Sequence, residues 1–168
     1  MGVFYAREIV EVAIQIEKNG RAFYTAMEGS VEDPELKGTY AFLAREEAKH
    51  IERFSQLGDR VKKGRPGTFM ESEEYGLYLE ALADEHVFRA DGSGEKMARK
   101  AKGKIGGLDI GIQFEKDTIL FFEELCGLIH AKDRSVIDRL ISEEKAHLKK
   151  LLDMKKKRSD KAREKKGG

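Results

Sequence analysis

Residues Leu43–His50 read LAREEAKH, and residues Leu140–His147 read LISEEKAH. A second pair of segments repeats in the same way: Ile14–Tyr24 reads IQIEKNGRAFY, and Ile112–Phe122 reads IQFEKDTILFF. The members of each pair lie 97 or 98 residues apart, and they follow the same order in the two halves of the chain. Repetition of this kind indicates two helix pairs of one design, related by an approximate twofold axis.

The residues around these segments have helical periodicity, with apolar side chains three and four positions apart. Four long helices are predicted, over about Phe4–Gly29, Pro34–Gly64, Glu95–Ile129 and Lys132–Lys157. Asp33 is a favourable N-cap for the second helix, and a shorter connector helix is predicted over about Ser72–Arg89. Glycines at 103, 106 and 107 are expected to break or bend the start of the third long helix. The pattern predicts an all-α fold, a four-helix bundle made of two helix pairs with a short connector helix between them.

Each long helix has one stripe of residues, spaced by three and four, that would face the core of such a bundle. Each stripe is apolar or small except at one level, where it carries a carboxylate: Glu17, Glu47, Glu115 or Glu144. The second and fourth stripes add a histidine three residues later, at His50 and His147. We expect the four levels to meet in the middle of the bundle.

Four ionised carboxylates inside an apolar core each cost several kcal/mol, unless a positive charge neutralises them. Protonation could neutralise some of them, but it gives no reason for the two histidines. Two divalent metal ions balance the charge, and a donor set of oxygens with one nitrogen for each ion suits iron, manganese or a mixed pair. Glu46 and Glu143 fall outside the stripes and are interpreted as solvated charges or as support for the ligands.

Length, charge and cysteine content restrict the alternatives. The chain has 168 residues and a net charge of +1, and its single cysteine excludes a four-cysteine metal site. No apolar run is long enough to span a membrane and none resembles a signal peptide, so we expect a cytoplasmic protein without a membrane partner. Residues 149–168 hold ten basic and three acidic residues, a charge of +7 that leaves −6 for the rest. We interpret residues 1–157 as the bundle and 158–168 as a basic, frayed tail, and we do not expect nucleic-acid binding.

These residues make the chain resemble the ferritin-like di-iron domain of rubrerythrins, over about Val3 to Leu152. The resemblance implies a carboxylate-bridged centre of two iron ions that reduces hydrogen peroxide. It implies that Glu47 and Glu144 bridge the irons and that the terminal ligands are Glu17, Glu115, His50 and His147. It also places Tyr24 at a position where the family often has a tyrosine near the ligands, so that the implied catalytic residues are Glu47, Glu144 and Tyr24.

Two departures from that family leave alternatives open. The chain has no pair of Cys-x-x-Cys motifs and therefore no rubredoxin domain, so electrons would come from a separate donor protein such as rubredoxin. Thr118 stands where many rubrerythrins carry a second glutamate that exchanges with histidine as the iron changes oxidation state. A ferroxidase that oxidises Fe(II) with dioxygen or peroxide, and a metallated adaptor bundle, are the alternative functions. Bundles of this kind often dimerise, so a homodimer is expected.

Overall fold

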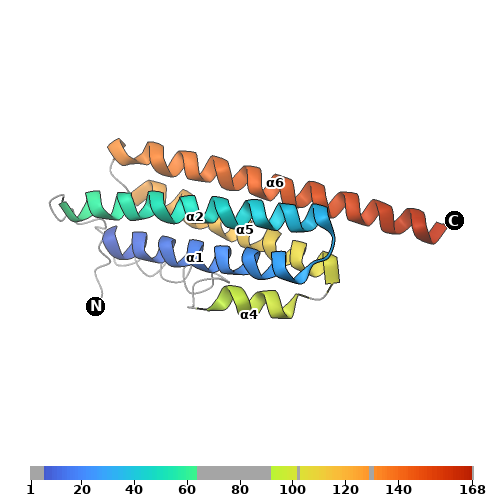
Figure 1. Ribbon diagram of the computed structural model, residues 1–168. Helices are drawn as coiled ribbons and strands as arrows, with labels where there is room; N and C mark the ends of the chain where they lie inside the picture. Colours follow the sequence, from blue (N-terminus) through green and yellow to red (C-terminus); the bar gives the residue numbers. More distant parts are fainter. Residues whose placement is uncertain (1–5, 64–91, 102, 129–130, 168) are drawn as a thin grey trace.

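The computed structural model describes residues 6–63, 92–101, 103–128 and 131–167, and these residues form five α-helices (Figure 1). The helices are α1 (Ala6–Ser30), α2 (Pro34–Lys63), α4 (Ser93–Lys100), α5 (Gly103–Leu128) and α6 (Ala131–Gly167). The prediction of an all-α fold is confirmed. The predicted connector helix over Ser72–Arg89 lies outside the described residues.

Four of the helices run alongside one another as two consecutive pairs. Helix α1 packs mainly on α2, and α5 packs mainly on α6, as the internal repeat predicts. The short helix α4 packs on α1 at the edge of the bundle, and the carboxyl end of α6 projects past the other helices (Figure 1). None of the described helices is long and apolar enough to cross a membrane.

The start of α2 shows how local sequence sets a helix boundary. Asp33 Oδ1 accepts hydrogen bonds from the backbone N–H groups of Glu35 and Leu36, each at 3.1 Å, so Asp33 is the N-cap that its sequence position predicts. The same carboxylate forms an ion pair with Arg158 of α6. The beginning of the first helix pair is therefore linked to the end of the second.

The third long helix is divided into α4 and α5 directly before Gly103, at the place where the glycines were expected to break or bend it. Ala101 has an extended conformation, with ψ 114°, and ends α4. Helix α4 approaches α1 so closely that a Cβ atom on Gly94 would lie 2.0 Å from the carbonyl oxygen of Asn19. The break between the two helices lets α4 lie against α1 at the edge of the bundle while α5 enters the bundle.

The last helix is longer than predicted. It was expected to end near Lys157 with a frayed tail over 158–168, but α6 continues to Gly167. Lys157 pairs with Glu35 at 2.5 Å, and Arg158, the first residue of the predicted tail, pairs with Asp33 and is thereby attached to the bundle. The residues beyond them are mostly Lys, Arg, Ala and Glu, which have high helix propensity, so the helix continues without further packing.

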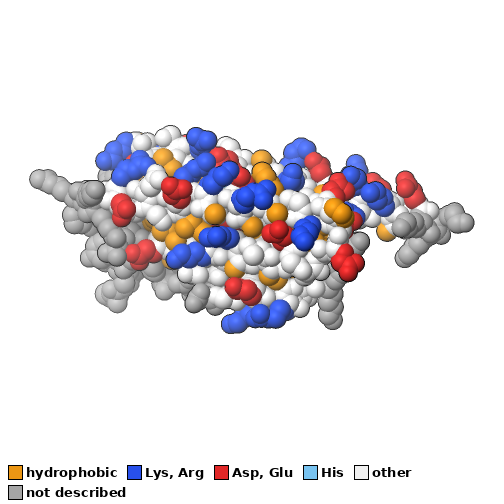
Figure 2. Space-filling view, in the orientation of Figure 1, with side chains coloured by type: hydrophobic (Ala, Val, Ile, Leu, Met, Phe, Trp, Pro, Cys, Tyr) orange, Lys and Arg blue, Asp and Glu red, His pale blue; other side chains and the backbone are white. Residues whose placement is uncertain are grey.

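The core is the set of stripes that helical spacing predicts. Every residue of the four stripes is buried: on α1 and α2 these are Val10, Ala13, Glu17, Gly20, Tyr24, Met27, Tyr40, Leu43, Glu47, His50, Phe54 and Leu57. On α5 and α6 they are Leu108, Gly111, Glu115, Thr118, Phe122, Leu125, Ile137, Leu140, Glu144, His147, Leu151 and Met154. On the face shown in Figure 2, acidic and basic side chains are interspersed, as the small net charge suggests. The bundle thus has a charged exterior and an apolar interior that is interrupted at one polar level.

Candidate metal centre

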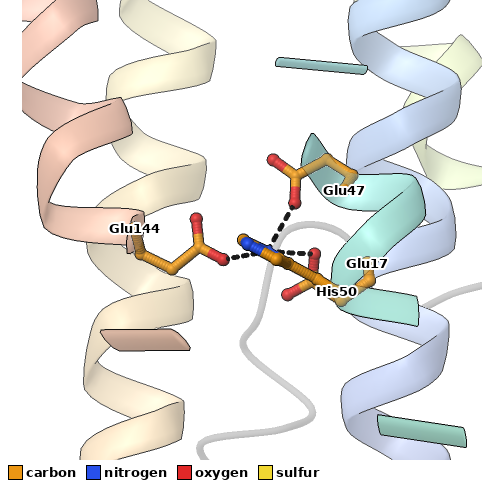
Figure 3. Close-up of side chains that lie close together, drawn as sticks. All are labelled: Glu17, Glu47, His50 and Glu144. Carbon is orange, nitrogen blue, oxygen red and sulfur yellow. Dashed lines mark ion pairs between the residues drawn. The ribbon is translucent and has the colours of Figure 1, made fainter. Parts of the chain in front are cut away.

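The first group of possible ligands joins three helices in the interior of the bundle. It consists of Glu17 from α1, Glu47 and His50 from α2, and Glu144 from α6, and all four are buried. His50 Nδ1 lies 3.5 Å from a Glu17 oxygen, 3.3 Å from a Glu47 oxygen and 2.6 Å from Glu144 Oε1. Figure 3 shows the three carboxylates converging on this nitrogen. One imidazole nitrogen and three carboxylates therefore lie close enough together to bind a single metal ion.

The second group repeats the design with the other helix pair. It consists of Glu47, Glu115, Glu144 and His147, which are also buried. His147 Nδ1 lies 2.9 Å from Glu144 and 3.9 Å from both Glu47 and Glu115. In each group one ligand atom from every residue lies within 4.8 Å of the others. Glu47 and Glu144 belong to both groups, which is the arrangement that bridging ligands between two metal ions require.

Three carboxylates of this centre have raised pKa values and the fourth has a lowered one, because the four are buried together. Burial, and then the charge of Glu144, raises the pKa of Glu17. The same two causes raise the pKa values of Glu47 and Glu115 well above that of an exposed glutamate. Burial would raise the pKa of Glu144 as well, but the two neighbouring histidines outweigh it and lower that pKa. Without a bound cation, the centre can hold its negative charges only by taking up protons.

The histidines respond in the opposite sense to the same neighbours. Burial alone would lower the pKa of His50, but the charge of Glu144 and the close carboxylates of Glu17 and Glu47 raise it far above its usual range. The pKa of His147 is also raised, because its contact with Glu144 outweighs burial. In the metal-free chain, both imidazoles therefore favour the protonated form.

The residues fit two divalent metal ions. Seven buried side-chain atoms of the two groups have no hydrogen-bond partner among the described residues, namely both oxygens of Glu17 and of Glu47, one oxygen of Glu115, one of Glu144, and His50 Nδ1. Buried polar atoms normally have partners, so this concentration indicates a missing ligand. Two dications would supply a charge of +4 against four carboxylates, and oxygen donors with one imidazole for each ion suit iron or manganese.

Tyr24 touches the centre from α1. Its hydroxyl donates a hydrogen bond to Glu115 Oε1, and the whole side chain is buried. Burial, and then the charge of Glu115, raises the pKa of Tyr24 well above that of an exposed tyrosine. The ring stacks on Tyr40, with centroids 6.1 Å apart. Tyr24 therefore stays protonated and donates its hydrogen bond to one of the possible ligands. Its position near the ligands is the one that the sequence resemblance implies.

Comparison with known proteins identifies the family. The family model of rubrerythrin matches residues 8–155 of the chain. This chain belongs to the rubrerythrin family. The solved structure of a protein from Thermotoga maritima, assigned as a ferritin-like diiron-carboxylate protein, is similar to it, with a TM-score of 0.66 and 26% sequence identity over 93% of this chain and 97% of that chain. No curated protein matches the chain. The ferritin-like bundle predicted from the repeat is confirmed, with two Glu/His groups typical of a di-iron site.

The two small residues beside the predicted ligands have different surroundings. Gly20 makes room for the ring of Phe114, since a Cβ atom at this position would lie 2.3 Å from Phe114 Cζ. Close helix packing against the Phe114 ring therefore explains Gly20. Thr118 is fully buried at the level where many rubrerythrins carry a second glutamate. Unlike a glutamate, its side chain offers no carboxylate to a metal ion.

Sequence reasoning did not find the groups that support His50 from outside. The second ring nitrogen of His50, Nε2, lies 3.1 Å from Glu143 Oε2. Glu143 in turn forms an ion pair with Arg53 and accepts a hydrogen bond from Arg139 Nε at 3.2 Å. Sequence analysis left Glu143 between two interpretations, and the contact with His50 decides for support. The sequence signal for Glu143 was its position directly before Glu144. Its contact with His50, 93 residues away in the sequence, could be seen only in the structure.

Proposed function

We propose that this rubrerythrin-family protein is an oxidoreductase that reduces hydrogen peroxide to water at a centre of two iron ions. The observation that carries the proposal is the pair of ligand groups sharing Glu47 and Glu144, each completed by one terminal glutamate and one histidine. Two ferrous ions held there would supply two electrons, the number that reduction of one hydrogen peroxide molecule to two water molecules requires.

The residues of the chain have distinct tasks in this proposal. Glu47 and Glu144 would hold both ions at a fixed separation, while His50 and His147 would each bind one ion through Nδ1. The apolar side chains above and below the centre exclude bulk water, which strengthens the electrostatic interactions inside. The Tyr24 hydroxyl donates a hydrogen bond to Glu115 Oε1 and so fixes the orientation of that carboxylate.

The electrons must be restored after each turnover. The single cysteine, Cys126, cannot form the four-sulfur iron site with which a rubredoxin domain carries electrons. We therefore propose that a separate electron-donor protein, such as a rubredoxin, reduces the centre.

Thr118 favours a second candidate function. Its buried side chain leaves the second ligand group with the four residues Glu47, Glu115, Glu144 and His147, and no further carboxylate stands at position 118 to exchange with a histidine. Without this exchange, the movement of iron with oxidation state that the resemblance implies would be lost, and iron oxidation becomes the second candidate. The alternative is thus a ferroxidase or iron-handling protein that uses dioxygen or peroxide.

Stopped-flow oxidation distinguishes the two candidates. The chain would be loaded anaerobically with Fe(II) and mixed with hydrogen peroxide or, separately, with air-saturated buffer. Oxidation at least tenfold faster with peroxide, at two irons per chain, supports peroxide reduction. A comparable or faster reaction with dioxygen supports the ferroxidase. The Glu46→Gln variant is the matched control, because Glu46 directly precedes Glu47 but belongs to neither ligand group.

A further inference from the structure

The two halves of the centre look equivalent in sequence but are supported differently in the structure. In each half, a second glutamate directly precedes the glutamate shared by both ligand groups: Glu46 before Glu47, and Glu143 before Glu144. By the approximate twofold symmetry, Glu143 of one half would contact the histidine of the other half, and Glu46 would do the same in return. Only one of these two contacts is present among the described residues.

The contact that is present fixes both nitrogens of His50. Nδ1 faces the three carboxylates of its group, and Nε2 lies 3.1 Å from Glu143. Glu143 also forms an ion pair with Arg53 and accepts a hydrogen bond from Arg139 Nε at 3.2 Å. Because Glu143 accepts from these donors, we take it as the acceptor for His50 Nε2 as well. A cation in the centre would bind Nδ1 while Nε2 keeps its contact with Glu143.

Among the described residues, none accepts a hydrogen bond from Nε2 of His147 as Glu143 does from His50. The ion pairs and hydrogen bonds of His147 with the described residues all run through Nδ1. The ring lines a surface pocket of about 400 Å³ between α2 and α6, with Phe42 beside it at a centroid distance of 6.0 Å. Glu46 lines the same pocket, but its carboxylate is paired with Lys49 at 2.6 Å. The ring of His147 is thus held from one side, whereas that of His50 is held from two.

The terminal glutamates, Glu17 and Glu115, also differ in a way that favours metal binding at the position of Glu17. Neither oxygen of Glu17 has a hydrogen-bond partner among the described residues, so both are available to a cation. Glu115 Oε1, in contrast, accepts the hydrogen bond of Tyr24, which withdraws electron density from that carboxylate. Since Glu47 and Glu144 are shared, the terminal ligands decide how the two positions differ.

We propose that Glu143 is a positioning residue for His50, and that the metal position formed by Glu17, Glu47, His50 and Glu144 therefore binds a divalent ion more tightly than the position with Glu115 and His147. This inference rests on the proposed metal centre. Supporting contacts of this kind orient the imidazole and raise its basicity, and their removal typically lowers metal affinity by about 10- to 100-fold. His147, a ligand of the weaker position, lines the surface pocket together with Glu143.

Titration with Co(II), which is stable to air and visible by absorption, tests the inference. The metal-free chain should bind two ions in two steps, the first at least about tenfold tighter. Glu143→Ala should weaken the first step by about 10- to 100-fold, and Glu143→Gln should restore most of it, because the amide oxygen accepts the same hydrogen bond. Glu46→Ala, the symmetry-related control, should titrate like the parent chain.

Proton NMR of the Co(II)-loaded chain gives a readout that a loss of fold would not imitate. At one equivalent, one shifted imidazole N–H resonance, that of His50, should be visible, and Glu143→Ala should broaden it through faster exchange with water. Two equal binding steps in the parent chain would overturn the inference, as would a Glu143→Ala variant that titrates normally or a Glu46→Ala variant with the same loss. Fewer than two ions bound by the parent chain would instead contradict the metal centre itself.

Discussion

Replacing Glu47 by glutamine should have opposite effects on stability with and without metal. In the metal-free chain Glu47 is fully buried, neither of its oxygens has a hydrogen-bond partner among the described residues, and burial with Glu144 and Glu17 raises its pKa. Glutamine has nearly the same shape, carries no charge, and can donate to the neighbouring carboxylates. The variant should therefore be more stable than the parent chain in the presence of a chelator, by about 1–4 kcal/mol.

Metal reverses the order. An ion present at a hundred times its dissociation constant stabilises the folded chain by about 2.7 kcal/mol, and two ions by about 5 kcal/mol. Because Glu47 belongs to both ligand groups, the variant should lose nearly all of this stabilisation. The net result is a chain that is more stable than the parent with chelator and less stable with metal.

Urea unfolding, followed by circular dichroism with EDTA and then with Mn(II), measures both terms. Glu46→Gln is the control, because Glu46 lies next in sequence and is partly exposed, and its effect should stay within about 0.5 kcal/mol in both conditions. The reasoning would be refuted by a Glu47→Gln variant that is clearly less stable than the parent with EDTA. It would equally be refuted by a variant that Mn(II) still stabilises to the full extent.

Four further predictions concern the ligands, the proton balance, which gives two of them, and the packing. Glu144→Ala should abolish binding of both ions, because Glu144 belongs to both groups, and metal analysis after gel filtration would contradict this if two ions per chain remained. Three of the four carboxyls of the centre have raised pKa values in the metal-free chain, so binding cations must displace protons. The apparent metal affinity should therefore rise with pH, by about tenfold per pH unit for each proton displaced. A pH-independent affinity measured by calorimetry would disprove this prediction. For the same reason the folded metal-free chain binds more protons than the unfolded chain, and its stability should fall as the pH rises above the range in which exposed glutamates titrate. Gly20→Ala should cost about 1–3 kcal/mol in urea unfolding because the new Cβ lies 2.3 Å from Phe114 Cζ, whereas Gly29→Ala, with nothing within 4 Å, should be neutral or stabilising; equal effects of the two would count against the packing explanation.

Helical spacing was sufficient to predict the core of this bundle. A stripe spaced by three and four projects onto one face of a helix, and an internal repeat requires the stripes of the two halves to face one another. For that reason all members of the four stripes are buried, and the six predicted ligands lie together in the two ligand groups. Their role as ligands stays a prediction, because it depends on bound metal.

What the sequence did not show depends on how helices are placed beside one another. The contact of Glu143 with His50 joins α6 to α2, and the repeat predicts an equivalent contact for Glu46 that the described residues lack. The glycines at 103, 106 and 107 predicted the break between α4 and α5, but the close approach of Gly94 to α1 is a distance between helices that no periodicity encodes. The extension of α6 to Gly167 follows from helix propensity and from ion pairs between distant segments.

The existence of a two-metal centre can be tested most directly by crystals of the chain loaded anaerobically with Fe(II), with diffraction data collected on both sides of the iron absorption edge. We predict two anomalous peaks per chain inside the bundle, one beside Glu17 and His50 and the other beside Glu115 and His147, with Glu47 and Glu144 between them. A single peak, or peaks only at the surface, would contradict a centre in which two ions share these carboxylates.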